Sequence, residues 1–153
     1  MTTPPDEPRL YATTAATVVV GVDLLARGRL ERAYTRRGDR LLRRLFTPRE
    51  LAEARNQISR LESRFAAKEA CAKALGVGIG HVASWQEIEI VRLPGGKPAL
   101  SLRGGAEARA RELGIAAFDV SISDTSELVM AVGVGVRDPL TPQSPLPDGE
   151  EES

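Results

Sequence analysis

The chain has 153 residues, of which 42% are hydrophobic, 27% charged and only 4% aromatic, and its 21 basic and 21 acidic side chains balance at pH 7. This length and apolar content suit one compact domain with a core of its own. Its apolar runs fall short of the roughly 18–20 residues that span a bilayer, and its single cysteine permits no internal disulfide. We therefore expect a cytoplasmic protein without a membrane span.

The chain is expected to begin with a flexible N-terminal extension, residues 1–16, which is rich in proline and carries acidic residues. Thr17-Val-Val-Val-Gly-Val-Asp23 then predicts a buried β-strand that ends at Asp23, because it is a run of β-branched residues. A carboxylate at the end of a buried strand needs a hydrogen bond, a cation or a metal ion. Asp23 could also cap the helix that follows, and the sequence leaves these roles open.

The next segment is strongly basic, with twelve arginines and two lysines against six acidic residues in 27–73, a net charge of +8. We predict a helix over about 26–37, an interruption at Gly38-Asp39 and a short continuation to Leu45. Five arginines recur every three or four residues and would form one stripe if the helix survives Gly38: Arg29, Arg32, Arg36, Arg40 and Arg43. The stripe is either a solvated face or a docking surface for an acidic protein. Nucleic acid is not favoured, because aromatic residues are few and recognised nucleic-acid motifs are missing.

Residues 64–76 predict an alanine-rich helix whose charged groups are regularly spaced. Arg64 and Lys68 are four residues apart, as are Glu69 and Lys73, so each pair shares a face. Gly76 predicts a left-handed C-cap. The helix is either exposed with two ordinary ion pairs, or it holds a metal ion and a polyphosphate together. In the second case Asp23 and Glu69 would supply two oxygen ligands, which suits Mg²⁺.

The remaining segments predict an α+β fold of mostly antiparallel strands with packed helices. Thr47-Pro48-Arg49-Glu50 has the pattern of a capping box that opens a helix. Further expected elements are a half-exposed strand over 87–93, a turn at 94–96, a strand over 98–102, a helix near 105–113 and a last hairpin of 118–123 with 128–136. Residues 137–153 predict a disordered, proline-rich acidic tail, so the folded domain is expected over 17–136.

Several of these motifs occur together in one family. Gly-Val-Asp23 followed by Arg29, the block Arg64-Phe-Ala-Ala-Lys-Glu69-Ala, Lys73-Ala-Leu-Gly76 and Gly96-Lys97-Pro98 resemble holo-acyl-carrier-protein synthase, the small bacterial type of 4′-phosphopantetheinyl transferase. The resemblance covers roughly residues 17–136. It implies transfer of the 4′-phosphopantetheine group of coenzyme A (CoA) to a serine of an acidic apo acyl carrier protein, with release of 3′,5′-ADP. It also implies a homotrimer with the CoA site between subunits.

The resemblance also implies roles for individual residues. Asp23 and Glu69 would hold Mg²⁺, and Lys73 would stabilise charge on the phosphates, which makes these three the expected catalytic residues. The residues expected to contact or border CoA are Arg64, Lys68, Lys73, Gly76, Lys97 and Pro98. The residues expected to contact the carrier protein are Arg29, Arg32 and Arg36.

Two positions depart from the family pattern. Asp124 stands where many members have histidine, so a water held by the metal or by Glu69 is the expected base, and Asp124 is either an acid of the site or a turn residue. Val77 replaces a common threonine. The two rival functions are a transferase for a secondary-metabolite carrier protein and a non-catalytic protein that only binds CoA or the carrier. The intact set of Asp23, Glu69 and Lys73 argues against the second.

Overall fold

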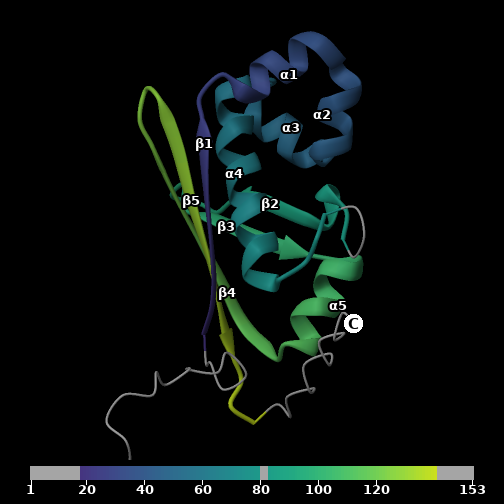
Figure 1. Ribbon diagram of the computed structural model, residues 1–153, viewed down its shortest axis with the longest axis vertical. Helices are drawn as coiled ribbons and strands as arrows, with labels where there is room; N and C mark the ends of the chain where they lie inside the picture. The colour runs from purple at the N-terminus through teal and green to yellow at the C-terminus, as the bar shows by residue number, and fades with distance from the viewer. Residues whose placement is uncertain (1–17, 80–82, 141–153) are drawn as a thin grey trace, which may run out of the picture.

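The computed structural model describes residues 18–79 and 83–140 and confirms the predicted α+β class. A long three-stranded sheet runs along one side of the molecule, and helix α4 (Ile58–Leu75) lies against it (Figure 1). Helices α1 (Arg29–Arg37), α2 (Asp39–Leu45) and α3 (Pro48–Ala54) gather at one end, and we call them the helical cap. Helix α5 (Gly104–Glu112) lies toward the other end, close to the predicted position.

The long sheet is antiparallel, with the strand order β1 (Val18–Ala26), β5 (Leu128–Arg137), β4 (Ile115–Asp124). The β4–β5 hairpin confirms the predicted last hairpin. β1 is an edge strand in which Asp23 lies opposite Ala131, and its pairing with β5 continues to Ala26. The prediction that the strand ends at Asp23 is therefore wrong, and a capping role for Asp23 is excluded, because α1 begins only after Gly28.

β1 is also not buried on both faces, contrary to the prediction. Successive side chains point to opposite faces of a strand, and only one face of β1 meets α4. The other face is apolar and lies in solvent. Its members, from β1 and β5, are 41–60% exposed: Val18, Val20, Val22, Leu24, Leu128, Met130 and Val136. We call these residues the exposed sheet face.

Helix α4 lies directly on the backbone of the sheet. A Cβ atom at Gly21 of β1 would be 2.0 Å from the carbonyl oxygen of Ala70 and 2.4 Å from the nitrogen of Ala74. A Cβ atom at Gly133 of β5 would be 3.2 Å from the backbone of Cys71. These two glycines let the helix approach closer than any side chain would allow.

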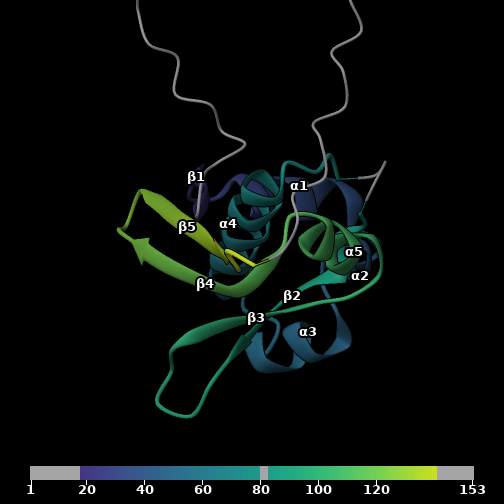
Figure 2. The ribbon, with the colours of Figure 1, turned by 90° about the horizontal axis from the view of Figure 1, so that it is seen from below.

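The second sheet is the predicted hairpin of β2 (Ile88–Arg92) and β3 (Pro98–Leu102). β3 lies beside β4, so the two sheets curve around α4, and the hairpin tip extends from the body (Figure 2). We predicted a half-exposed strand here, but Ile88, Glu89, Ile90 and Val91 are all buried. The reason is that α3 packs against β2: its N-cap Thr47 donates a 2.5 Å hydrogen bond to the Glu89 side chain, and its Glu50 accepts a 2.8 Å hydrogen bond from the Ile90 N–H at the open edge of the strand.

The helical cap follows the predicted breaks. Gly38 has φ 67° and ψ −162°, a conformation that ends α1, and α2 begins at the next residue. The five arginines therefore do not share one continuous helix. Thr47 and Glu50 form the predicted capping box, with Pro48 at the first turn of α3. The cap has an apolar cluster of its own, with Phe46 fully buried in it.

The ends of the chain are only partly covered by the structure. β5 runs to Arg137, just past the predicted domain end, and the description stops at Leu140. The expected N-terminal extension and most of the expected tail lie outside the described residues. Within 18–79 and 83–140, the helices are too short or too polar to cross a membrane.

Candidate active site

Asp23, Glu69 and Lys73 meet where β1 lies against α4. The Lys73 ammonium donates hydrogen bonds to Asp23 Oδ1 at 3.0 Å and to the Val22 carbonyl at 3.1 Å. The ordinary ion pair expected between Glu69 and Lys73 is not formed, and in the described part of the chain Glu69 takes part in neither hydrogen bonds nor ion pairs. α4 and β1 thus bring together residues that are far apart in the sequence, and we call this trio the acid–lysine cluster.

The electrostatics of the acid–lysine cluster favour a bound cation. Burial raises the pKa of the Glu69 carboxyl, and the nearby charge of Asp23 raises it further, while Lys73 and Arg29 act in the opposite direction. The Asp23 side chain is only 15% exposed. Two neighbouring carboxylates that share one lysine are incompletely neutralised, and an additional positive charge would relieve their repulsion.

This donor set fits Mg²⁺ bound together with a phosphate. Groups of three or more acidic, histidine or cysteine side chains suited to a metal do not occur among residues 18–79 and 83–140. A closed site of the structural zinc type therefore has no basis there. Mg²⁺ usually takes one or two carboxylates and completes its octahedron with water and substrate phosphates, which the pair of Asp23 and Glu69 permits.

The start of α1 is fastened to α4 by residues that the sequence did not indicate. The Gly28 N–H donates a 2.7 Å hydrogen bond to Glu62, a residue of α4 that is 3% exposed. Arg27 forms ion pairs with Glu62 at 3.5 Å and with Asp124, and donates to the Thr125 carbonyl at 3.0 Å. Asp124, for which two roles were open, is thus engaged by Arg27 at the β4–β5 turn. We know of no local pattern that would have predicted this arrangement.

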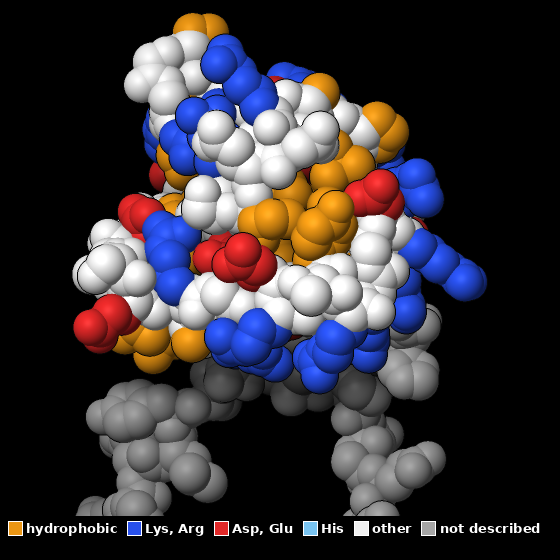
Figure 3. All heavy atoms as spheres, turned by 90° about the horizontal axis from the view of Figure 1, so that it is seen from above, with side chains coloured by type: hydrophobic (Ala, Val, Ile, Leu, Met, Phe, Trp, Pro, Cys, Tyr) orange, Lys and Arg blue, Asp and Glu red, His pale blue; other side chains and the backbone are white. Residues whose placement is uncertain are grey.

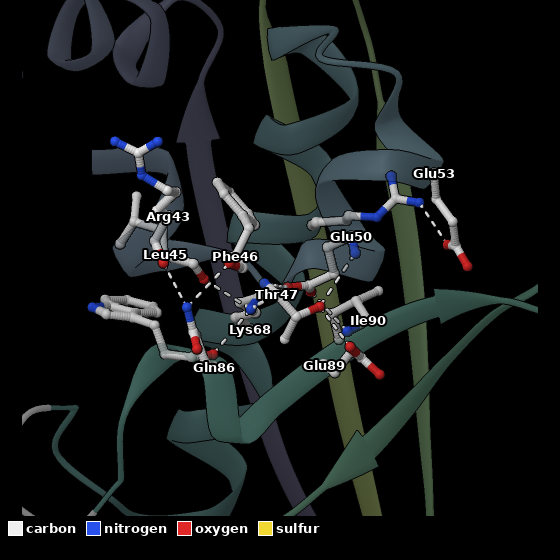
Figure 4. Close-up of polar contacts among 12 residues, drawn as sticks. Arg43, Leu45, Phe46, Thr47, Glu50, Glu53, Lys68, Gln86, Glu89 and Ile90 are labelled. Atoms are coloured by element: carbon white, nitrogen blue, oxygen red, sulfur yellow. Dashed lines mark hydrogen bonds and ion pairs between the residues drawn. The ribbon is translucent and has the colours of Figure 1, made fainter. Parts of the chain in front are cut away.

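Lys68 does not lie with the acid–lysine cluster. It is fully buried on the α3 side of α4, where its ammonium contacts Glu50 at 2.6 Å and the carbonyls of Leu45 and Trp85, each at 2.9 Å (Figure 4). Burial lowers the pKa of Lys68, and the charge of Glu50 opposes this shift. Its three donors already have acceptors, so the expected contact of Lys68 with CoA phosphates does not fit the structure.

Arg64 shares this side of α4, as its spacing from Lys68 predicts. It is 3% exposed and donates to Glu53 at 3.1 Å, while its Nε has no hydrogen-bond partner within the described residues. Arg64 borders a groove of about 550 Å³ together with Arg55 and Arg92. It is therefore near other cations, and apart from the acid–lysine cluster.

Other predicted residues are dispersed. Lys97 and Pro98 border a groove of about 680 Å³ between β3 and β4, and Lys97 forms an exposed ion pair with Asp119 at 3.1 Å. Gly76 ends α4 in the left-handed conformation, φ 65°, as predicted.

Burial raises the pKa of the Cys71 thiol to about 12, so this thiol is not a nucleophile at neutral pH. Gly80, in the glycine-rich stretch that follows α4, and His81, the single histidine of the sequence, lie outside the described residues.

The three predicted docking arginines lie on α1, and the first of them, Arg29, is near the acid–lysine cluster. Arg29 is close enough to lower the pKa of Glu69, and Arg36 is in the last turn of the helix. Figure 3 shows the end of the molecule that carries the helical cap, with many Lys and Arg side chains along the rim of this face around an apolar centre. The arrangement offers a cationic surface next to two carboxylates.

Comparisons with known proteins indicate the family of this chain. The 4′-phosphopantetheinyl transferase superfamily matches residues 19–132. The chain is 45% identical over 125 residues to the holo-[acyl-carrier-protein] synthase of Herpetosiphon aurantiacus, with 78% of this chain and 98% of the relative covered. It is 41% identical over 131 residues to that of Rhodopseudomonas palustris, with 78% and 94% covered.

Solved structures of similar proteins give the same result. The holo-[acyl-carrier-protein] synthase of Neisseria meningitidis matches with a TM-score of 0.71 at 33% identity, covering 78% of this chain and 98% of the other. That of Helicobacter pylori, in complex with coenzyme A, matches with a TM-score of 0.69 at 31% identity, covering 76% and 98%. The chain therefore belongs to the holo-[acyl-carrier-protein] synthase family of 4′-phosphopantetheinyl transferases.

Proposed function

We propose that this protein transfers the 4′-phosphopantetheine group of CoA to a serine hydroxyl of an apo acyl carrier protein in a Mg²⁺-dependent reaction. The serine oxygen would form a bond to the β-phosphorus of CoA, and the bond from that phosphorus to the bridging oxygen would break, releasing 3′,5′-ADP. The observation that carries this proposal is the convergence of Asp23, Glu69 and Lys73 in a chain of this family. The convergence provides both cation ligands and a fixed positive charge.

Asp23 and Glu69 would hold Mg²⁺, which when bound neutralises charge on the pyrophosphate. Lys73 makes two hydrogen bonds within the described residues, to Asp23 and Val22, and its side chain is 53% exposed. An ammonium group has three donors, so one remains for a phosphate oxygen. Lys73 would thus orient the pyrophosphate for attack and stabilise the charge that develops on it.

The serine proton would leave through a water held by Glu69. Within the described residues the Glu69 side chain takes part in neither hydrogen bonds nor ion pairs, so it has oxygen lone pairs free to hold that water. Asp124 is the alternative acid near the site, but its ion pair with Arg27 neutralises its charge. Glu69 is therefore preferred over Asp124 as the group that receives the proton through water.

Arg29, Arg32 and Arg36 would dock the carrier protein. All three lie on α1, so the break at Gly38 does not separate them. Opposed charge patches accelerate encounter and fix the register of two proteins, which suits an acidic partner. Because Arg29 lies near Glu69, a carrier held on α1 would approach the acid–lysine cluster.

We propose that the active form is a homotrimer. The exposed sheet face is a continuous apolar surface of β1 and β5, and soluble proteins rarely leave such a surface uncovered. The groove that Lys97 and Pro98 border includes Val132, Val134 and Val136 of β5. Closed symmetric assembly through this face would cover it, and would place Lys97 of one copy toward the acid–lysine cluster of the next.

The function is tested by the intact mass of an apo acyl carrier protein incubated with this protein, CoA and Mg²⁺. A gain of one phosphopantetheine that EDTA and Asp23→Asn both prevent supports the proposal. CoA binding without mass gain, for carriers of fatty-acid and secondary-metabolite type alike, would favour the non-catalytic alternative. A mass gain on only one of the two carrier types would show which pathway the protein serves. Action in the cytoplasm stays a prediction.

The trimer is tested by sedimentation of the wild-type protein and of Val20→Lys, which places a charge in the exposed sheet face. We expect a trimer for the wild type, and monomers with little transfer activity for the variant. A wild type that sediments as a monomer at the concentration at which it transfers would refute the assembly and leave the chemistry untouched.

A further inference from the structure

A buried ion pair connects the helical cap to α4. Lys68 and Glu50 are both 0% exposed, and their Nζ and Oε2 atoms are 2.6 Å apart. Lys68 is the residue before Glu69 of the acid–lysine cluster, but it points to a different side of the helix, toward α3 (Figure 4). The pair therefore lies behind the proposed site and does not belong to it.

The hydrogen bonds of this pair join five segments at one point. Lys68 of α4 donates to the Leu45 carbonyl at the end of α2, and to the Trp85 carbonyl in the 3₁₀ turn before β2. Glu50 of α3 accepts from the N–H groups of Thr47 and Ile90, each at 2.8 Å, and the second of these lies in β2. The Lys68 ammonium and the Glu50 carboxylate thus make all their hydrogen bonds to neighbouring groups of the protein.

The contacts extend outward from the pair. The Thr47 hydroxyl donates to Glu89 of β2 at 2.5 Å, and Glu89 also lies 3.7 Å from the Arg103 guanidinium. The Lys68 ammonium lies 5.3 Å from the centre of the Phe46 ring, which belongs to the apolar cluster of the cap. The end of α2 is therefore held by polar and apolar contacts from the same lysine.

Such a pair is a poor source of stability. Removing two charges from water costs several kcal/mol per ion in real proteins, and well-packed uncharged substitutes are often equally stable or more stable. What an ion pair adds is direction, because its hydrogen bonds fail at the wrong distance or angle, whereas apolar packing is not directional. The pair thus specifies where the helical cap sits more than whether it folds.

The placement of the helical cap matters because α1 carries the docking arginines. α1 packs against α2 and α4, and the carbonyl of Leu45 ties the far end of α2 to Lys68. A shift of α2 would therefore displace the end of α1 that carries Arg36, while the start of α1 stays held to α4 by the Gly28–Glu62 hydrogen bond. The acid–lysine cluster would not follow, because α4 is seated on the sheet at Gly21 and Gly133.

We propose that Lys68 and Glu50 are positioning residues that fix the helical cap on α4, so that a carrier protein docked on α1 meets the acid–lysine cluster. This inference rests on the proposed function. Neither residue contacts CoA or the carrier, and both act through Leu45, Thr47 and the helices they end or begin. The effect of the pair should therefore be confined to the carrier protein's side of the reaction.

The test replaces the pair by neutral residues of similar size, Lys68→Met with Glu50→Gln, because a single change would bury an unpaired charge and could prevent folding. The control is Arg111→Met with Glu107→Gln, which removes an exposed ion pair of α5. We expect the KM for the carrier protein to rise about tenfold or more and kcat to fall, because small displacements of a reactant slow reaction strongly. The KM for CoA and the affinity for 3′,5′-ADP should stay within about twofold of wild type, as should all values of the control.

Other outcomes would overturn the inference. A parallel loss of affinity for CoA and 3′,5′-ADP would make Lys68 a phosphate ligand after all. Unchanged kinetics in a folded double variant would reduce the pair to a part of the core. If the wild type itself transfers nothing, the proposed function fails, and the positioning role is then judged by amide hydrogen exchange alone.

Hydrogen exchange gives a readout that does not depend on activity. In the double variant the amides of α1 and α2 should exchange at least about tenfold faster than in wild type, because the anchor of α2 is lost. The amides of β4 and β5 should be unchanged. Equal exchange throughout the helical cap in both proteins would refute the positioning role.

Discussion

Lys73 pairs with Asp23 across the junction of α4 and β1, and not with Glu69, its neighbour one turn earlier on the same helix. The lysine therefore belongs to a tertiary contact, and Glu69 keeps its carboxylate available. An exposed helix with ordinary i,i+4 pairs would show the opposite arrangement. Asp23, Glu69 and Lys73 therefore form a cluster in which one carboxylate is paired with the lysine and the other is not.

Lys73→Met should lower kcat about 100-fold, because one preorganised charge at a developing anion is typically worth that much. The fold should be kept, since the Lys73 side chain is 53% exposed. The measurement is single-turnover transfer followed by intact mass, with Arg111→Met as a control of matched chemistry on α5. A Lys73→Met variant with wild-type kcat would remove Lys73 from the proposed catalytic residues.

Glu69 should make Mg²⁺ binding sensitive to pH above the ordinary range of a glutamate. Its pKa is raised from 4.5, mainly by burial and then by Asp23, so protons compete with the metal at a higher pH than usual. We expect proton release when Mg²⁺ binds at mildly acidic pH, measured by calorimetry in buffers of different ionisation enthalpy. Glu69→Gln should bind Mg²⁺ weakly and release no proton.

The same shift has a defined effect on stability. A raised pKa in the folded state means that the native protein holds this proton more tightly than the unfolded chain. Stability of the metal-free protein should therefore fall as pH rises from 4.5 through the raised pKa, and this contribution should be missing in Glu69→Gln. Saturating Mg²⁺ should reverse the loss above the raised pKa.

Arg32→Glu and Arg36→Glu should raise the KM for the carrier protein about tenfold each, through a slower and less salt-dependent encounter. Arg29 is left out of this test because it also affects Glu69. The KM for CoA should not change, and Arg111→Glu provides a charge reversal outside α1. Equal effects on both substrates would indicate damage to folding and count against α1 as the docking helix.

Gly21→Ala should destabilise the protein by about 3 kcal/mol or more, at the upper end of the range for overpacking. The added Cβ would meet the backbone of Ala70 and Ala74, which cannot move without lifting α4 from β1. Gly95→Ala is the comparison, because space there is open and only its φ of 92° is unfavourable. Denaturant unfolding of both variants checks the difference, and equal midpoints would contradict the predicted contact.

Cys71 should resist alkylation in the native protein. Burial raises the pKa of its thiol to about 12, so the reactive thiolate is scarce even at mildly alkaline pH. Mass spectrometry after brief iodoacetamide treatment should show modification only when denaturant is added. Rapid native labelling would mean that α4 separates from Gly133 often.

Local signals in the sequence predicted much of the fold. The capping box at Thr47, the helix break at Gly38 and the C-cap at Gly76 each depend on a few adjacent residues, and each is where the pattern placed it. The two hairpins follow from alternating residues around glycine-rich or polar turns. These features need no knowledge of distant contacts.

Features set by distant contacts were not predictable. Whether β2 is half-exposed depends on α3, which contacts the Glu89 side chain through Thr47 and the open edge of the strand through Glu50. The role of Lys68 depends on which side of α4 meets the helical cap, and spacing within one helix cannot reveal this. Arg27 pairs with Asp124, which is almost a hundred positions away in the chain. The sequence left several roles open for Asp23; its pairing with Lys73 comes from α4, and its strand continues because β5 pairs with it to the end.

The seating of α4 on Gly21 and Gly133 has a consequence for how this protein can diversify. Because main chain rests on main chain there, the spacing between Asp23 and Glu69 is not adjustable by exchanging side chains of different size. Substitutions in the surrounding core would leave the two carboxylates in register. New partner preferences would instead arise at the helical cap and the β2–β3 hairpin, where substitutions would not disturb the contact between α4 and the sheet.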